Sequence, residues 1–121
     1  MAKIIKLKTN KTKKGHLTSL DRELPFLAKR VYFLHDIKQI RGKHAHKKNI
    51  QIIICLKGTC KIKIIDIRKN KVKKYKIFIL NKINKALYLN PWDWHEITNY
   101  SKNTLIAVIA SEKYNIDDYV E

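Results

Sequence analysis

The stretch that decides the fold is Arg41-Gly42-Lys43-His44-Ala45-His46, with Gln51 and Gly58 following it. Side chains at positions i and i+2 of a β-strand point to the same face, so His44 and His46 converge on one ligand if this stretch is a strand. The next polar residue of the pattern, Gln51, offers a neutral amide oxygen, which is a poor ligand for a divalent ion. Histidines that hold no metal exchange protons near neutral pH, and this favours acid/base chemistry.

Short apolar runs with strand character dominate the rest of the chain, and polar or glycine-containing turn signals separate them. Short strands at even spacing are typical of a sandwich or barrel, so we expect an all-β protein. From residue 113 onward the sequence predicts at most a short closing helix. The expected strands cover residues 15–20, 29–36, 50–56, 60–67, 75–80, 86–89 and 104–110.

The length of 121 residues fits one domain, so we expect residues 1–121 to form a single domain around one core. No apolar stretch approaches the roughly 18 residues of a membrane span, and the first residues lead into charge rather than an apolar leader. We therefore expect a cytoplasmic protein that does not enter a membrane. Cys55 and Cys60 lack the close partners of a thiolate zinc site, so they are interpreted as buried thiols.

The formal net charge of +17 raises the question of nucleic-acid binding. Arginine, which suits base recognition and bidentate phosphate contacts, occurs at only four positions. Lysine is spread along the chain rather than gathered in one block, so we expect no nucleic-acid partner. The charge still favours an anionic ligand such as a diphosphate. The arginines are Arg22, Arg30, Arg41 and Arg68.

Two blocks of this sequence resemble the two halves of the cupin motif. The first is the histidine pair with Gln51 and Gly58, where metal-binding cupins carry a glutamate in place of Gln51. The second is the ordered set Ala86, Pro91, His95 and Asn99. This resemblance implies a cupin double-stranded β-helix, or jelly roll, whose histidine face lines the mouth of the barrel, where small ligands bind.

A closer resemblance covers nearly the whole chain and is to the dTDP-4-keto-6-deoxyglucose 3,4-ketoisomerases. That family implies a metal-free isomerase without cofactor, built as a homodimer, which moves a ketone from C4 to C3 of a dTDP-linked deoxysugar. Its product would feed deoxyaminosugar biosynthesis for a surface glycan such as lipopolysaccharide. The resemblance rests on residues 41–47 with Gln51, on Arg30-Val31-Tyr32, on Pro91 with Trp94-His95-Glu96, and on residues 110–119.

The resemblance also implies roles for individual residues. His44 and His46 are the catalytic pair, one exchanging the carbon-bound proton and the other serving the sugar oxygens, in an order that the sequence leaves open. The face of C4 that receives the proton is left open too. The stretch Asp66-Ile67-Arg68-Lys69-Asn70 departs from the family's Asp-Asp-Gly turn and is interpreted as a strand connection. The implied substrate-binding residues are Tyr32, Arg30, Arg41, Lys43, Gln51, Trp94 and His95.

Three other functions compete with this hypothesis. A sugar-nucleotide epimerase on a similar cupin also removes a proton beside a ketone, and only its product distinguishes it. A metal cupin such as a dioxygenase would hold about one ion per chain at the histidines. A basic polyanion-binding protein without catalysis would bind DNA with a strong dependence on salt.

Overall fold

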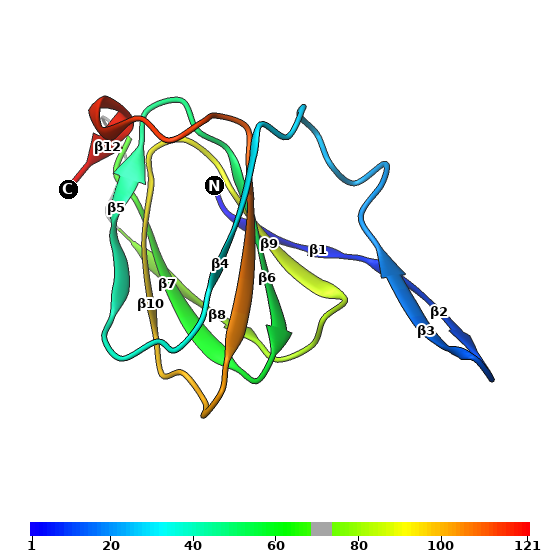
Figure 1. The fold of residues 1–121 in the computed structure, drawn as a ribbon. Coiled ribbons are helices and arrows are strands. Elements are labelled where there is room, and N and C mark those ends of the chain that lie inside the picture. Colours follow the sequence, from blue (N-terminus) through cyan, green and yellow to red (C-terminus); the bar gives the residue numbers. More distant parts are fainter. Residues whose placement is uncertain (69–73) are drawn as a thin grey trace.

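The computed structural model describes residues 1–68 and 74–121, and it consists of two five-stranded antiparallel sheets that face each other (Figure 1). One sheet has the order β1 (Lys3–Lys6), β9 (Lys85–Leu89), β6 (Gln51–Lys57), β11 (Leu105–Ala110) and β4 (Arg30–Leu34). The other has the order β12 (Tyr119–Val120), β5 (Arg41–His46), β10 (Asp93–Thr98), β7 (Cys60–Asp66) and β8 (Tyr75–Leu80). This arrangement confirms the predicted all-β jelly roll.

The core lies between the two sheets because apolar side chains alternate along their strands. On β7 the residues Cys60, Ile62 and Ile64 are buried, while Lys61 and Lys63 between them are partly exposed. Period-two burial of this kind is what a strand with one solvated face requires. The opposite sheet contributes its own inward residues, and both cysteines are free and buried, as predicted. The members from that sheet include Ile53, Cys55, Leu87, Leu89, Ile106 and Val108.

The outer face of the first sheet carries a second, smaller apolar cluster. Ile52, Ile54 and Ala86 are buried there although they point away from the main core. The segment between β3 and β4 covers them with Leu24 and Phe26. A strand that is buried on both faces has apolar residues at consecutive positions, which explains the unbroken run of apolar residues in β6.

Strands β2 (Lys8–Thr12) and β3 (Gly15–Ser19) form a separate hairpin that projects away from the two sheets (Figure 1). Most of its residues are exposed, and Leu17 near its tip has a relative exposure of 59%. A two-stranded hairpin alone is marginally stable in water. The hairpin is therefore a candidate for contact with another surface.

Each of the seven strands expected from the sequence is confirmed, with ends that differ by at most two residues. The expected closing helix is a single 3₁₀ turn, η1 (Ile116–Asp118), followed by the two residues of β12. Of the predicted strand connection Asp66-Ile67-Arg68-Lys69-Asn70, residues 69 and 70 lie outside the described residues, which resume at residue 74. In residues 1–68 and 74–121 no helix has the length and apolar character to cross a membrane.

Candidate active site

Three histidine rings meet on the inner face of the sheet that carries β5 and β10. His44 and His46 belong to β5, and His95 on β10 is the direct cross-strand partner of His44. The ring centroid of His44 lies 4.9 Å from that of His46 and 4.8 Å from that of His95. Alternation along the strand explains why both β5 histidines share one face.

Acceptors beside the Nδ1 atoms fix the tautomers of the β5 histidines. Nδ1 of His44 lies 3.0 Å from the carbonyl oxygen of Gly42, and Nδ1 of His46 lies 3.1 Å from Oδ2 of Asp118. Carbonyl and carboxylate oxygens only accept, so each Nδ1 carries the proton and each Nε2 of the neutral ring keeps a lone pair. Nε2 of His46 is buried without a hydrogen-bond partner among the described residues. A free lone pair on an oriented ring is what a general base needs.

Asp118 is itself held in place by the backbone that follows β5. Its carboxylate accepts hydrogen bonds from the backbone N–H of Lys48 at 2.8 Å and of Asn49 at 3.2 Å. Its carbonyl oxygen accepts a third from the N–H of Lys47 at 2.9 Å. The turn η1 therefore presents the carboxylate to His46 in a fixed orientation, which in turn sets the orientation of the imidazole.

Burial lowers the pKa of all three histidines below the ordinary value near 6.5. For His46 burial and the nearby His44 lower the pKa, while the hydrogen bond and charge of Asp118 oppose that shift. For His95 burial lowers the pKa to about 3. At neutral pH the rings are therefore uncharged, and His44 and His46 are ready to accept a proton.

A cavity of about 310 Å³ opens beside the rings, between the two sheets. His44 and His95 line it from one sheet, and β4 of the other sheet contributes Arg30 and Tyr32. Arg41 lies at the start of β5 and also lines it. The cavity thus joins proton-accepting rings to two cations and a phenol.

Gln51 supports the cavity from behind. It has a relative exposure of 2%, and its Nε2 donates a hydrogen bond of 3.0 Å to the hydroxyl oxygen of Tyr32. Burial raises the pKa of Tyr32, so its hydroxyl keeps its proton and remains able to donate it to a ligand. The guanidinium of Arg30 stacks over the Tyr32 ring at 4.3 Å. Gln51 therefore orients the hydroxyl of Tyr32.

In the described part of the chain, no group of three His, Cys, Asp or Glu side chains is arranged to hold a metal ion.

Besides Gln51 behind Tyr32, and His46 behind the ring of His44, two predicted site residues do not line this cavity. Lys43 is exposed and adopts a φ of 60°, next to Gly42 with a φ of 88°, so regular alternation fails at this point of β5. Trp94 alternates with the buried His95 on β10 and pairs with Ile65 on β7, which places it on the outer face of the sheet. Neither Lys43 nor Trp94 is among the residues that line the cavity.

Two residues of the site, Asp118 and Tyr119, received no role from the sequence. Tyr119 pairs with His46 across β12 and β5, and its ring centroid lies 4.6 Å from His44 and 4.5 Å from His46. It also lines the cavity. The only signal for both was their place in the block at residues 110–119 that resembles the ketoisomerases.

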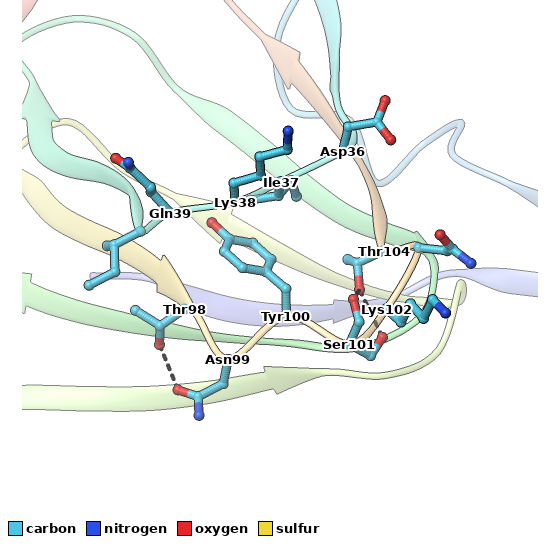
Figure 2. Close-up of a pocket in the computed structure, with 12 residues that line it drawn as sticks. Asp36, Ile37, Lys38, Gln39, Thr98, Asn99, Tyr100, Ser101, Lys102 and Thr104 are labelled. Atoms are coloured by element: carbon cyan, nitrogen blue, oxygen red, sulfur yellow. Dashed lines mark hydrogen bonds between the residues drawn. The ribbon is translucent and has the colours of Figure 1, made fainter.

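A larger cavity of about 600 Å³ lies between the loop that precedes β5 and the loop that follows β10 (Figure 2). Several of its polar side chains bind one another: Thr98 donates to Asn99, and Ser101 and Thr104 share a hydrogen bond of 2.8 Å. Histidine is absent from its lining within the described chain. The acid/base groups therefore identify the smaller cavity as the candidate active site.

The low pKa of His95 predicts a pH-dependent stability. Between about pH 6.5 and pH 3 the unfolded chain binds a proton on His95 that the folded chain does not, so the free energy of unfolding falls as the pH falls through this window. The contribution is on the order of 1 kcal/mol per pH unit. His95→Gln is expected to reduce this slope in urea denaturation at pH 7, 5.5 and 4.5. An unchanged slope would contradict the assignment.

Comparison with known proteins gives one consistent result. The family described as FdtA, WxcM-like, C-terminal matches residues 1–121. The chain is 34% identical over 122 residues to a TDP-4-oxo-6-deoxy-α-D-glucose-3,4-oxoisomerase of Aneurinibacillus thermoaerophilus, covering 98% of this chain and 84% of that protein.

Solved structures agree with that relative. A 3,4-ketoisomerase from Helicobacter canadensis superimposes with a TM-score of 0.90 at 34% identity, covering 98% of this chain and 89% of that one. A histidine-to-asparagine mutant of the 3,4-ketoisomerase QdtA from Thermoanaerobacterium thermosaccharolyticum, in complex with TDP-4-keto-6-deoxyglucose, gives 0.89 at 34% identity, with coverages of 98% and 86%. A dTDP-4-dehydrorhamnose 3,5-epimerase from Bacillus anthracis shares the fold at 18% identity, with a TM-score of 0.86 and coverages of 98% and 76%.

Proposed function

The chain belongs to the FdtA family, and from this membership and the histidine site we propose that it is a TDP-sugar 3,4-ketoisomerase acting on TDP-4-keto-6-deoxyglucose. The observation that carries the proposal is the cluster of three neutral histidines beside a cavity that also contains Arg30, Tyr32 and Arg41. The family relationship supports the substrate class, and the site supports the chemistry.

The reaction requires two proton transfers at neighbouring carbons. The C4 ketone acidifies the proton on C3, so a base removes that proton while O4 receives one, and an enediol forms. Loss of the proton on O3 and delivery of a proton to C4 then leave the ketone at C3. Each step uses a group that accepts and donates protons near pH 7 and donors that stabilise the developing oxygen charge.

His46 is the base for the proton on C3 in this proposal. A carbon-bound proton is the harder one to remove, and Asp118 stabilises the imidazolium that results, whereas His44 has only the carbonyl of Gly42. His44, which lines the cavity, serves the sugar oxygens and C4. The ring of His46 packs against the rings of His44 and Tyr119, which line the cavity, so in this proposal substrate binding moves these rings to let the C3 proton reach His46.

The remaining polar groups bind the substrate. Tyr32 accepts a hydrogen bond from Gln51 and so directs its own proton toward the enediol oxygens. Arg41, on the exposed side of the cavity, suits the diphosphate, because a guanidinium forms paired hydrogen bonds with phosphate oxygens. Arg30 lies over the rings of Tyr32 and Tyr114 and lines the same cavity.

The test of this function is turnover of TDP-4-keto-6-deoxyglucose in deuterium oxide. NMR is expected to detect a 3-keto product that carries deuterium at C4. A product inverted at C3 or C5 with its ketone still at C4 would identify an epimerase instead. Absence of both exchange and product would exclude the proposal.

We further propose that the protein acts as a homodimer, in the cytoplasm. The hairpin of β2 and β3 is exposed, and so are Val31 and Phe33 on the edge strand β4, with relative exposures of 54% and 55%. A second copy of the chain would cover these apolar residues, as stable interfaces do. Sedimentation at micromolar concentration should give twice the mass of 14.3 kDa, and a monomer would refute the dimer.

The proposed location in the cytoplasm rests on the two free thiols, which fit a reducing compartment. Cell fractionation tests this location.

A further inference from the structure

An ion pair between the buried Asp93 and the partly exposed Arg68 lies beyond the histidine cluster, where β7 ends and β10 begins. Asp93 has a relative exposure of 1%, and its Oδ1 accepts a hydrogen bond of 3.1 Å from Arg68. The same guanidinium lies 2.8 Å from Asp66 and donates a bond of 2.6 Å to the carbonyl oxygen of Pro91. Arg68 therefore binds the turn between β9 and β10 at two points.

Asp93 also closes that turn from within. Its Oδ2 accepts a hydrogen bond of 2.9 Å from the backbone N–H of Asn90, and its own N–H donates to the Asn90 carbonyl at 3.2 Å. Trp92, inside the turn, adopts a φ of 68°, a conformation that is rare for a bulky residue and costs free energy. The side chains of Arg68 and Asp93 hold the chain in this conformation.

The turn and the residue that follows it are bonded to two histidines of the site, to the backbone of His46 and to the ring of His95. The N–H of Trp92 donates a hydrogen bond of 2.7 Å to the carbonyl oxygen of His46. The carbonyl oxygen of Asp93 lies 3.4 Å from Nδ1 of His95, two residues along β10. Any change in the turn therefore moves the end of β5 and the start of β10 together.

We propose that Arg68 and Asp93 are positioning residues for the isomerisation, because the turn that they hold fixes His46 and His95 relative to each other. The proposal rests on the function given above and adds residues that do not line the cavity. Stability alone is a weak reason for the pair, since buried ion pairs often contribute little net stability compared with apolar substitutes. The reason that we propose for the pair is positional: it keeps the histidines in place, and even a small displacement of a catalytic group lowers the rate by a large factor.

The experiment compares Asp93→Asn with Arg68→Lys. Asp93→Asn keeps the shape of the side chain but loses one acceptor, and Arg68→Lys keeps the charge but cannot reach both Asp93 and Pro91. Each variant is expected to lower kcat about 10- to 100-fold with KM changed less than about threefold. Arg68→Lys serves as the reporter if Asp93→Asn does not fold. The matched control is Glu112→Gln, which removes the exposed ion pair to Lys29 and is expected to leave kcat unchanged.

An NMR measurement separates positioning from simple stability. The imidazole signals of His46 and its titration are expected to shift in folded Asp93→Asn or Arg68→Lys and to stay unchanged in Glu112→Gln. A folded variant with unchanged kcat and unchanged His46 signals would overturn the proposal, even if its melting temperature fell. The NMR measurement needs no turnover. It therefore tests the positioning of His46 even if the protein does not catalyse the proposed reaction.

Discussion

His46→Asn is expected to lower kcat by at least about 10³-fold while the fold persists. Asparagine retains a donor toward Asp118 but has no titratable nitrogen at the position of Nε2. The reaction then lacks the base that removes the C3 proton. Steady-state turnover with circular dichroism as the check on folding measures the loss.

Exchange with solvent distinguishes the two β5 histidines. In deuterium oxide, His46→Asn is expected to lose both exchange at C3 and product, whereas His44→Asn should keep exchange at C3 while product formation falls. His16→Asn is the matched control, because His16 is exposed on β3 and does not line the cavity. The opposite pattern of exchange would reverse the assignment of the two roles.

Asp118→Asn is expected to lower kcat about 10²- to 10³-fold and to shift the pH profile. Asp118 raises the pKa of His46 through its hydrogen bond and charge, against the lowering by burial. A base must be neutral to act, so activity falls as the pH drops through this pKa. Removing the carboxylate lowers the pKa further, and the acid limb of kcat/KM should move to lower pH.

The neighbouring residue provides a matched control for that variant. Asp117 also belongs to η1 but is exposed, so Asp117→Asn changes the same net charge without touching His46. It is expected to leave both kcat and the acid limb in place. If Asp118→Asn left the maximal kcat unchanged, or moved the acid limb of kcat/KM to higher pH, the role of the Asp118 carboxylate would be refuted.

Much of the fold could be predicted because the strands carry their pattern locally. The alternation of lysine with isoleucine in β7 and the apolar run of β6 each indicate a strand without knowledge of its neighbours. Strands β10 and β12 were not among the expected strands, and β1 and β2 were missed because they are short and rich in lysine. Their structure depends on pairing with β9 and β3 rather than on their own composition.

The site was predictable where it depends on spacing within one strand. The i and i+2 positions of His44 and His46 suffice to place both rings on one face. The role of Lys43 came from the family resemblance alone, whereas alternation places a residue adjacent to His44 on the opposite face, and Lys43 is exposed. Asp118 reaches His46 from 72 residues away, and a contact over that separation leaves no local pattern in the sequence.

That separation also determines the stage of folding at which the chain becomes catalytically active. The His46–Asp118 contact closes a loop of more than half the chain. Closing this loop costs conformational entropy, which other native contacts must offset before the His46–Asp118 contact can stabilise the fold. Contacts of such range form late, together with the pairing of β12 on β5. Recovery of turnover after dilution from denaturant therefore reports completion of the whole barrel, and partly folded chains contribute none of it.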